Sequence, residues 1–146
     1  MQILNKKARL NYKILDTLEA GIELLGPEVK SIRAGQVSLD GAHIIIGIEK
    51  HGLEARLYGM RAAAYLPAGN SQNINPARTR KLLMRKDQIE SLYAESKSRG
   101  ATLIPLRIYD KRGWIKVEVA LARGKKKWQK KEILKNRDIK REVDRV

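Results

Sequence analysis

The chain has 146 residues and a formal net charge of +15, with 31 Lys and Arg residues against 16 Asp and Glu residues. A charge excess of this size points to a polyanionic partner, and the length is that of one domain. The sequence contains no cysteine, which excludes disulfides, thiolate zinc sites and cysteine nucleophiles. No apolar run reaches the roughly 18 residues of a membrane span, and residues 1–7 lack a signal-peptide core. We therefore expect a soluble, cytoplasmic protein that binds nucleic acid and has no membrane partner.

Residues 11–25 contain two strand-like runs, which we expect to meet at Ala20-Gly21. Ile14 and Leu18 share one parity of this segment, together with a tyrosine at its start. Glu19 has the opposite parity, among polar residues, so the alternation predicts that Glu19 faces solvent.

The next segment has the signals of a short helix over residues 26–35. Pro27 occupies the first helical position, Glu28 lies in the first turn, and a glycine ends the segment. Lys30 and Arg33 lie on the polar side of this helix.

Two β-rich runs, residues 43–48 and 53–58, are predicted to form a hairpin, and residues 59–78 form a long polar loop. The basic cluster Arg78-Thr-Arg-Lys81 closes that loop. It fits either a solvated loop end or an RNA contact, and its place beside the polar loop favours the contact. Residues 82–84 form either a short strand or the lead into the following helix.

A capping box at Asp87-x-x-Glu90 opens a further helix, and two strands, residues 102–109 and 114–123, follow it. Alternation along the last strand puts its β-branched residues on one face and Lys116 on the other, outward face. About six strands, two or three helices and glycine-rich turns predict a β-rich α+β fold, a closed or partly open β-barrel with flanking helices.

Catalytic patterns are lacking in the sequence. The two histidines, His43 and His51, have no spacing that predicts a shared site, and no phosphate-binding loop, zinc-protease motif or serine elbow occurs. We therefore expect neither an enzyme nor a bound cofactor or metal.

The segment from Lys125 to Val146 holds ten Lys and Arg residues against four Asp and Glu residues, with Trp128 as its only aromatic residue. Its few apolar residues cannot offset the entropy of ordering it alone, so we expect a tail that folds on its partner. Trp128 either stacks on an RNA base or docks on the barrel, and the surrounding lysines favour stacking. This divides the chain into a body, residues 1–124, and a basic C-terminal tail, residues 125–146.

Five motifs together resemble those of the bacterial SsrA-binding protein (small protein B) family. In chain order they are Asn5-Lys-Lys-Ala-Arg9, Glu19-Ala-Gly21, Gly26-x-Glu28-Val-Lys-Ser-Ile-Arg-Ala-Gly35, Arg78-x-Arg-Lys-Leu-Leu83 and Ala122-Arg-Gly-Lys-Lys126. The resemblance implies an oligonucleotide-binding (OB-like) barrel. It also implies that the protein binds transfer-messenger RNA, not DNA, and brings it to stalled ribosomes in trans-translation.

The resemblance also implies roles for single residues. Glu19, Leu83 and Lys116 match positions that the family uses to bind transfer-messenger RNA, and Lys30 and Arg33 are further RNA contacts. The tail would enter the decoding centre and mRNA channel of the small ribosomal subunit. Its implied ribosome-directed residues are Gly124, as a hinge, with Lys125, Lys126, Trp128, Lys130 and Lys131.

One departure from the family pattern follows Trp128. Many members have Asp-Lys-Arg at this point, whereas this chain has Gln129-Lys-Lys131, so a carboxylate and a guanidinium are both missing.

Two other functions stay open on the residues alone. They are a ribosomal protein with an rRNA-penetrating tail and, with less support, an RNA-processing enzyme.

Overall fold

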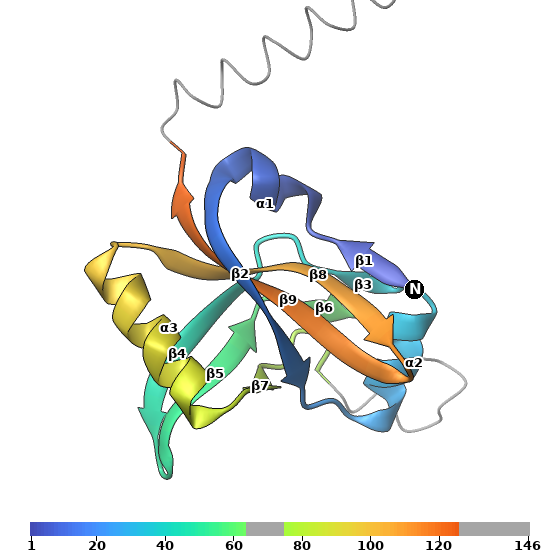
Figure 1. Ribbon diagram of the computed structural model, residues 1–146. Coiled ribbons are helices and arrows are strands. Elements are labelled where there is room, and N and C mark those ends of the chain that lie inside the picture. Colours follow the sequence, from blue (N-terminus) through green and yellow to red (C-terminus); the bar gives the residue numbers. More distant parts are fainter. Residues whose placement is uncertain (64–74, 126–146) are drawn as a thin grey trace, which may run out of the picture.

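The computed structural model describes residues 1–63 and 75–125, and its helices and strands are shown in Figure 1. None of the helices in these ranges is long and apolar enough to cross a membrane. The elements are β1 (Gln2–Leu4), α1 (Lys6–Asn11), β2 (Tyr12–Ile22), α2 (Gly26–Arg33), β3 (Val37–Ser38), β4 (His43–Glu49), β5 (Gly52–Tyr58), β6 (Arg61–Ala62), β7 (Arg80–Leu83), α3 (Lys86–Ser98), β8 (Thr102–Lys111) and β9 (Trp114–Gly124).

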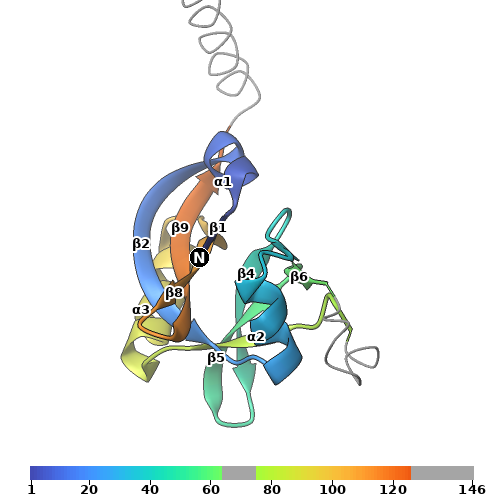
Figure 2. The same ribbon diagram turned by 90° about the vertical axis from the view of Figure 1, so that its right-hand side faces the viewer.

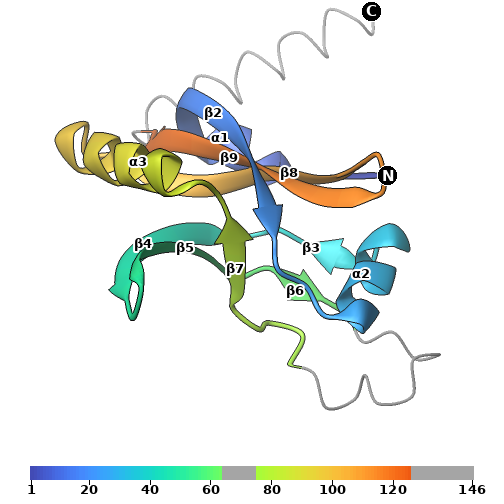
Figure 3. The ribbon, with the colours of Figure 1, turned by 60° about the horizontal axis from the view of Figure 1, so that its bottom comes forward.

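The main sheet closes on itself as an antiparallel barrel. Its strand order is β8-β4-β5-β7-β2-β9, and pairing of β9 with β8 completes the ring, while β1 adds to β8. The joint between β4 and β8 is narrow, because only Ile44 and Leu103 pair there. In Figures 2 and 3 the β2, β8 and β9 strands form one wall of the barrel, and the β4–β5 hairpin forms the opposite one. The predicted β-rich barrel with flanking helices is confirmed.

Strand β2 is continuous from Tyr12 to Ile22. The prediction of two runs that meet at Ala20-Gly21 was therefore wrong. Pairing with β9 extends along β2, with a β-bulge between Ile14 and Asp16. The extra residue of a bulge reverses which face the following side chains occupy. Ile14 therefore packs under α1 with Ala8, whereas Leu18 packs on the main core inside the barrel. The common face expected for these two residues was wrong.

Strand β9 is buried on one face along most of its length and on the other face only near its end. Val117, Val119 and Leu121 are at most 1% exposed and fill the barrel. On the opposite, nominally outward face, Ala120 and Ala122 are fully buried in a second cluster with Ala8 of α1. The small alanine side chains let α1 pack closely over this end of the strand. The outward face predicted for the strand is thus open only in its first half.

The helices begin and end close to the predicted positions. Helix α2 starts at Gly26, the Glu28 carboxylate accepts a hydrogen bond from the Leu25 amide (2.9 Å), and Gly35 (φ 76°) follows its end. Helix α3 starts earlier than its predicted capping box. The Gln88 side chain accepts a bond from the Arg85 amide (3.1 Å), so the box at Asp87 and Glu90 was wrong by two residues.

Candidate RNA-binding surface

The strand register brings Glu19, Leu83 and Lys116 onto one surface. Gly21 of β2 pairs with Lys116 of β9 on one side and with Leu83 of β7 on the other. Paired residues of antiparallel strands point to the same face, and Glu19, two residues before Gly21, shares it. We call this open surface, formed by Glu19, Leu83, Tyr109, Lys111, Trp114 and Lys116, the β2–β9 face.

Glu19 is held by two residues of β8. The Tyr109 hydroxyl donates a hydrogen bond to its carboxylate, and the Lys111 ammonium lies 3.3 Å from the same oxygen. The hydrogen bond from Tyr109 is the main reason why the pKa of Glu19 lies below its ordinary value of 4.5, and Lys111 and Lys116 add to the effect. Glu19 therefore stands as a fixed, ionised acceptor on the barrel surface, suited to donors such as ribose hydroxyls or base amino groups.

The pKa of Tyr109 is shifted in the opposite direction. Partial burial, followed by its bond to Glu19, raises the pKa of the Tyr109 hydroxyl to about 12. The hydroxyl therefore stays protonated, as a donor, throughout the neutral range. Sequence reasoning missed Tyr109 and Lys111, because nothing in the sequence says which residues of two distant strands lie side by side.

We expect the change Tyr109→Phe to raise the pKa of Glu19 back towards 4.5, because it removes the largest influence that lowers it. An NMR titration of the Glu19 side-chain carboxyl signal measures this directly. Tyr93→Phe, on helix α3, is the matched control and leaves the titration of Glu19 unchanged. An unchanged pKa in Tyr109→Phe would show that the hydroxyl does not hold the carboxylate in solution.

Leu83 provides the apolar part of this face. Its side chain is 51% exposed, whereas its neighbour Leu82 points into the barrel and is 1% exposed. A Cβ atom at Gly21 would lie only 3.1 Å from the Leu83 Cβ, so glycine at that position gives Leu83 room beside β2. An exposed leucine on an open sheet offers a contact for a base or a sugar.

Lys116 is the cation of this face without a carboxylate partner within salt-bridge distance among the described residues. The neighbouring guanidinium of Arg107 lies over the Tyr109 ring, 4.2 Å from its centroid, and 3.4 Å from Glu118. An ammonium group with no ion pair at salt-bridge distance in this part of the chain is the better candidate for a phosphate contact.

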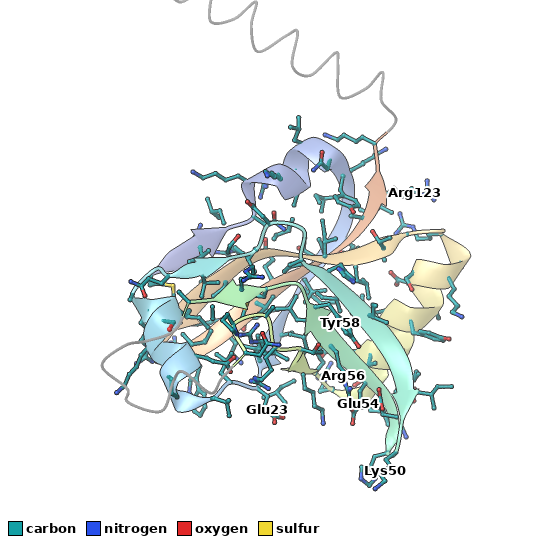
Figure 4. The ribbon with its side chains drawn as sticks, turned by 180° about the vertical axis from the view of Figure 1, so that it is seen from behind. Glu23, Lys50, Glu54, Arg56, Tyr58 and Arg123 are labelled. Carbon is teal, nitrogen blue, oxygen red and sulfur yellow. The ribbon has the colours of Figure 1, made fainter. Side chains whose placement is uncertain are left out.

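Two cations on β5 and β7, Arg56 and Lys81, are already paired. Figure 4 shows Glu54 and Arg56 along β5, and Arg56 lies 3.2 Å from Glu54 and 3.5 Å from Glu49. Lys81 lies 3.5 Å from Glu54 as well. No group of three or more potential metal ligands occurs within residues 1–63 and 75–125. Arg56 and Lys81 are therefore less available than Lys116 for an anionic ligand.

Lys30 and Arg33 both belong to α2, at one end of this face. The Arg33 guanidinium donates to the Gly113 carbonyl (3.0 Å) and lies 3.4 Å from an Asp110 carboxylate oxygen. Arg33 therefore connects α2 to the turn between β8 and β9. Lys30 is exposed on the same helix.

Within the basic cluster at Arg78–Lys81, both arginines bind a buried carboxylate, whereas Lys81 is exposed. Arg80 is completely buried, and its guanidinium donates to Glu28 at 2.6 and 2.9 Å and to the Met60 carbonyl at 2.6 Å. Arg78 donates to the other oxygen of Glu28 at 2.5 Å. Burial raises the pKa of Glu28, but the bonds from Arg78, the Leu25 amide and Arg80 outweigh it, and the net pKa lies below 4.5. These arginines hold α2 against β7.

Hydrogen bonds still hold Lys125 against the folded body. Gly124 is the last residue of β9, paired with Tyr12, and the Lys125 amide donates to the Asn11 carbonyl (2.9 Å). The Lys125 ammonium donates to the Arg9 carbonyl near the end of α1 (2.8 Å), a favourable place for a cation. The remaining candidate tail residues, namely Lys126, Trp128, Lys130 and Lys131, lie outside the described residues.

Comparison with known proteins decides the family. The model of a family described as "SmpB protein" matches residues 2–146. The chain belongs to the SmpB protein family. The resemblance drawn from the five motifs is thereby confirmed.

Relatives and a solved structure agree with this assignment. SsrA-binding proteins of Trichodesmium erythraeum and Streptococcus suis are 45% and 49% identical to this SmpB-family chain over 142 residues, which is 97% of this chain and 88% of each relative. A solved structure described as "tmRNA-SmpB: a journey to the center of the bacterial ribosome" contains a chain that is 42% identical. That match has a TM-score of 0.67 and covers 86% of this chain and 85% of that chain.

Proposed function

We propose that this SmpB-family chain binds transfer-messenger RNA, the SsrA RNA, through the β2–β9 face and delivers it to stalled ribosomes for trans-translation. The observation that carries the proposal is the convergence of Glu19, Leu83 and Lys116 on one open surface from three strands. An ionised acceptor, an apolar side chain and an unpaired ammonium group together suit a folded RNA surface, where hydroxyl, base and phosphate lie close together. Lys30 and the basic end of α2 extend this face.

In this proposal the protein is a non-enzymatic, cytoplasmic adaptor with two parts. The barrel binds the tRNA-like part of transfer-messenger RNA, and the tail, beyond Lys125, acts in the decoding centre and mRNA channel. Trp128 stacks on a base there, and the lysines from Lys126 to Lys131 contact rRNA phosphates. The anchoring of Lys125 on α1 supports a boundary just after this residue.

Affinity for different RNAs tests the function. We expect tighter binding to transfer-messenger RNA than to bulk tRNA or ribosomal RNA fragments, in gel-shift titrations at two salt concentrations. Lys116→Ala should lower the slope of log affinity against log salt by about 0.7–0.9, the loss of one phosphate contact. Equal, salt-sensitive binding to all three RNAs would instead favour a ribosomal protein with an rRNA-penetrating tail.

Substitutions of two adjacent leucines distinguish an effect on RNA binding from an effect on stability. Leu83→Ala should weaken binding to transfer-messenger RNA with little loss of stability, because this side chain is half exposed. Leu82→Ala removes a buried side chain and should lower the free energy of unfolding by about 2–5 kcal/mol. Urea unfolding and gel-shift titration of both variants measure the two effects. Leu83→Ala with unchanged RNA affinity would remove Leu83 from the binding surface.

A further inference from the structure

Trp114 is a large aromatic side chain with no structural use in the described fold. It is the first residue of β9 and is 73% exposed. It belongs to neither hydrophobic cluster, and no aromatic ring stacks on it in residues 1–63 and 75–125. Burying an indole removes a large apolar area from water and stabilises the fold. An exposed indole gives up that stabilisation, so its exposure calls for another explanation.

The strand register places Trp114 on the β2–β9 face. It pairs with Lys111 of β8, and alternation along β9 gives it the same side as Lys116. Lys111 in turn contacts Glu19 (3.3 Å), so the register partner of Trp114 reaches the centre of the proposed RNA surface.

The turn that carries Trp114 is held in place. Arg33 of α2 contacts the carboxylate of Asp110 and the carbonyl of Gly113, the residue just before Trp114. The Asp110 side chain also accepts a bond from the Gly113 amide (2.9 Å). An indole on a fixed turn loses little conformational freedom when a ligand stacks on it.

The charge around the indole favours a nucleic-acid ligand over an apolar protein surface. Lys111 and Arg112 precede Trp114 in the turn, and Lys116 follows it in the strand. Cations interleaved with an exposed aromatic ring neutralise phosphates while the ring stacks on an unpaired base.

We propose that Trp114 is a stacking platform for an unpaired nucleobase of the RNA bound on the β2–β9 face, and that Arg33 positions it by holding the turn. The proposal rests on the proposed function and adds to it a base contact at the α2 end of the face. A stacked base contributes affinity that does not depend on counterion release, unlike the contact of Lys116.

The test uses the fact that the chain has two tryptophans, Trp114 and Trp128. In full-length Trp128→Phe, whose own RNA affinity is measured as the reference, Trp114 is the only indole. Adding the tRNA-like domain of transfer-messenger RNA should quench its fluorescence and protect it from acrylamide. Adding Trp114→Ala to this reference should weaken binding by roughly 5- to 150-fold and leave the salt slope unchanged, as expected for one stacked base. Trp114→Phe in the same reference should keep most of the affinity.

Ile48→Ala is the matched control, because Ile48 is 81% exposed on the β4–β5 hairpin of the opposite wall, and it should bind normally. RNA affinity unchanged by Trp114→Ala, with the reference protein binding tightly, would overturn the stacking proposal and leave the proposed function intact. Indole quenching by ribosomes but not by the RNA would overturn it too. Failure of the reference protein and wild type alike to prefer this RNA would reject the proposed function itself.

Discussion

Removing residues 126–146 is expected to abolish peptide tagging on stalled ribosomes while leaving binding to transfer-messenger RNA close to that of the full chain. The deleted segment holds nine Lys and Arg residues against four Asp and Glu residues, so it must act on an anionic partner if it acts at all. If that partner is the ribosome, the salt dependence of binding to transfer-messenger RNA should not change. Gel-shift titration and an in vitro tagging assay on ribosomes without a codon measure the two activities.

The truncation keeps Lys125, whose backbone and ammonium group bond to the end of α1, so the body retains its last anchor. Full-length Trp128→Ala separates the aromatic ring from the charge and should slow tagging without weakening RNA binding. A truncated protein that lost affinity for transfer-messenger RNA would contradict the division into body and tail. Normal tagging by Trp128→Ala would remove the stacking role of that ring.

The change Glu28→Gln should cause the largest loss of stability among single substitutions of charged residues. Glu28 is 3% exposed, and its carboxylate forms ion pairs with Arg80, which is completely buried, and with Arg78. Removing one partner of a buried ion pair leaves an uncompensated charge and typically costs about 3–5 kcal/mol. Urea unfolding at neutral pH measures the loss. Because α2 and β7 both flank the β2–β9 face, RNA affinity should fall as well.

Acid should reduce the difference in the free energy of unfolding between wild type and Glu28→Gln. The pKa of Glu28 is below 4.5 in the folded protein, so its ion pairs stabilise fully above about pH 4.5 and are lost as the pH falls through the folded-state value. Glu54→Gln is the control, since Glu54 pairs with the partly exposed Arg56 and Lys81, and this change should cause a much smaller loss of stability. Equal losses in the two variants would contradict a structural role for the buried cluster.

The fold was largely predictable because its local signals agree with its packing. Pro27 and Gly35 mark α2, and alternation marks the β8–β9 hairpin. Within β2, however, the bulge after Ile14 reverses the facing of later residues, and no local pattern announces one extra residue in a strand. The burial of Ala120 under α1 was equally hidden, because the size of a side chain does not show which helix covers it.

For the proposed RNA surface, the sequence pointed to single residues but not to how they are arranged. Resemblance pointed to Glu19, Leu83 and Lys116, and the strand register places them together. The hydrogen bond from Tyr109 to Glu19 depends on a contact between strands that are distant in sequence, and no local sequence pattern encodes such a contact. The prediction that Arg78 and Arg80 form an RNA contact missed their structural role for a related reason. The buried carboxylate of Glu28, distant in sequence, makes Arg80 part of the core and also binds Arg78, which is only partly buried.

Hydroxyl-radical footprinting of the full-length protein, with and without the tRNA-like domain of transfer-messenger RNA, tests the binding surface most directly. Oxidation of each side chain, read by mass spectrometry, reports its exposure. Leu83, 51% exposed, and Tyr109 should be protected by the RNA, while Ile48, 81% exposed on the opposite wall, should be oxidised as before. Protection of Ile48 with unchanged oxidation of Leu83 and Tyr109 would place the RNA on the other wall and contradict the account.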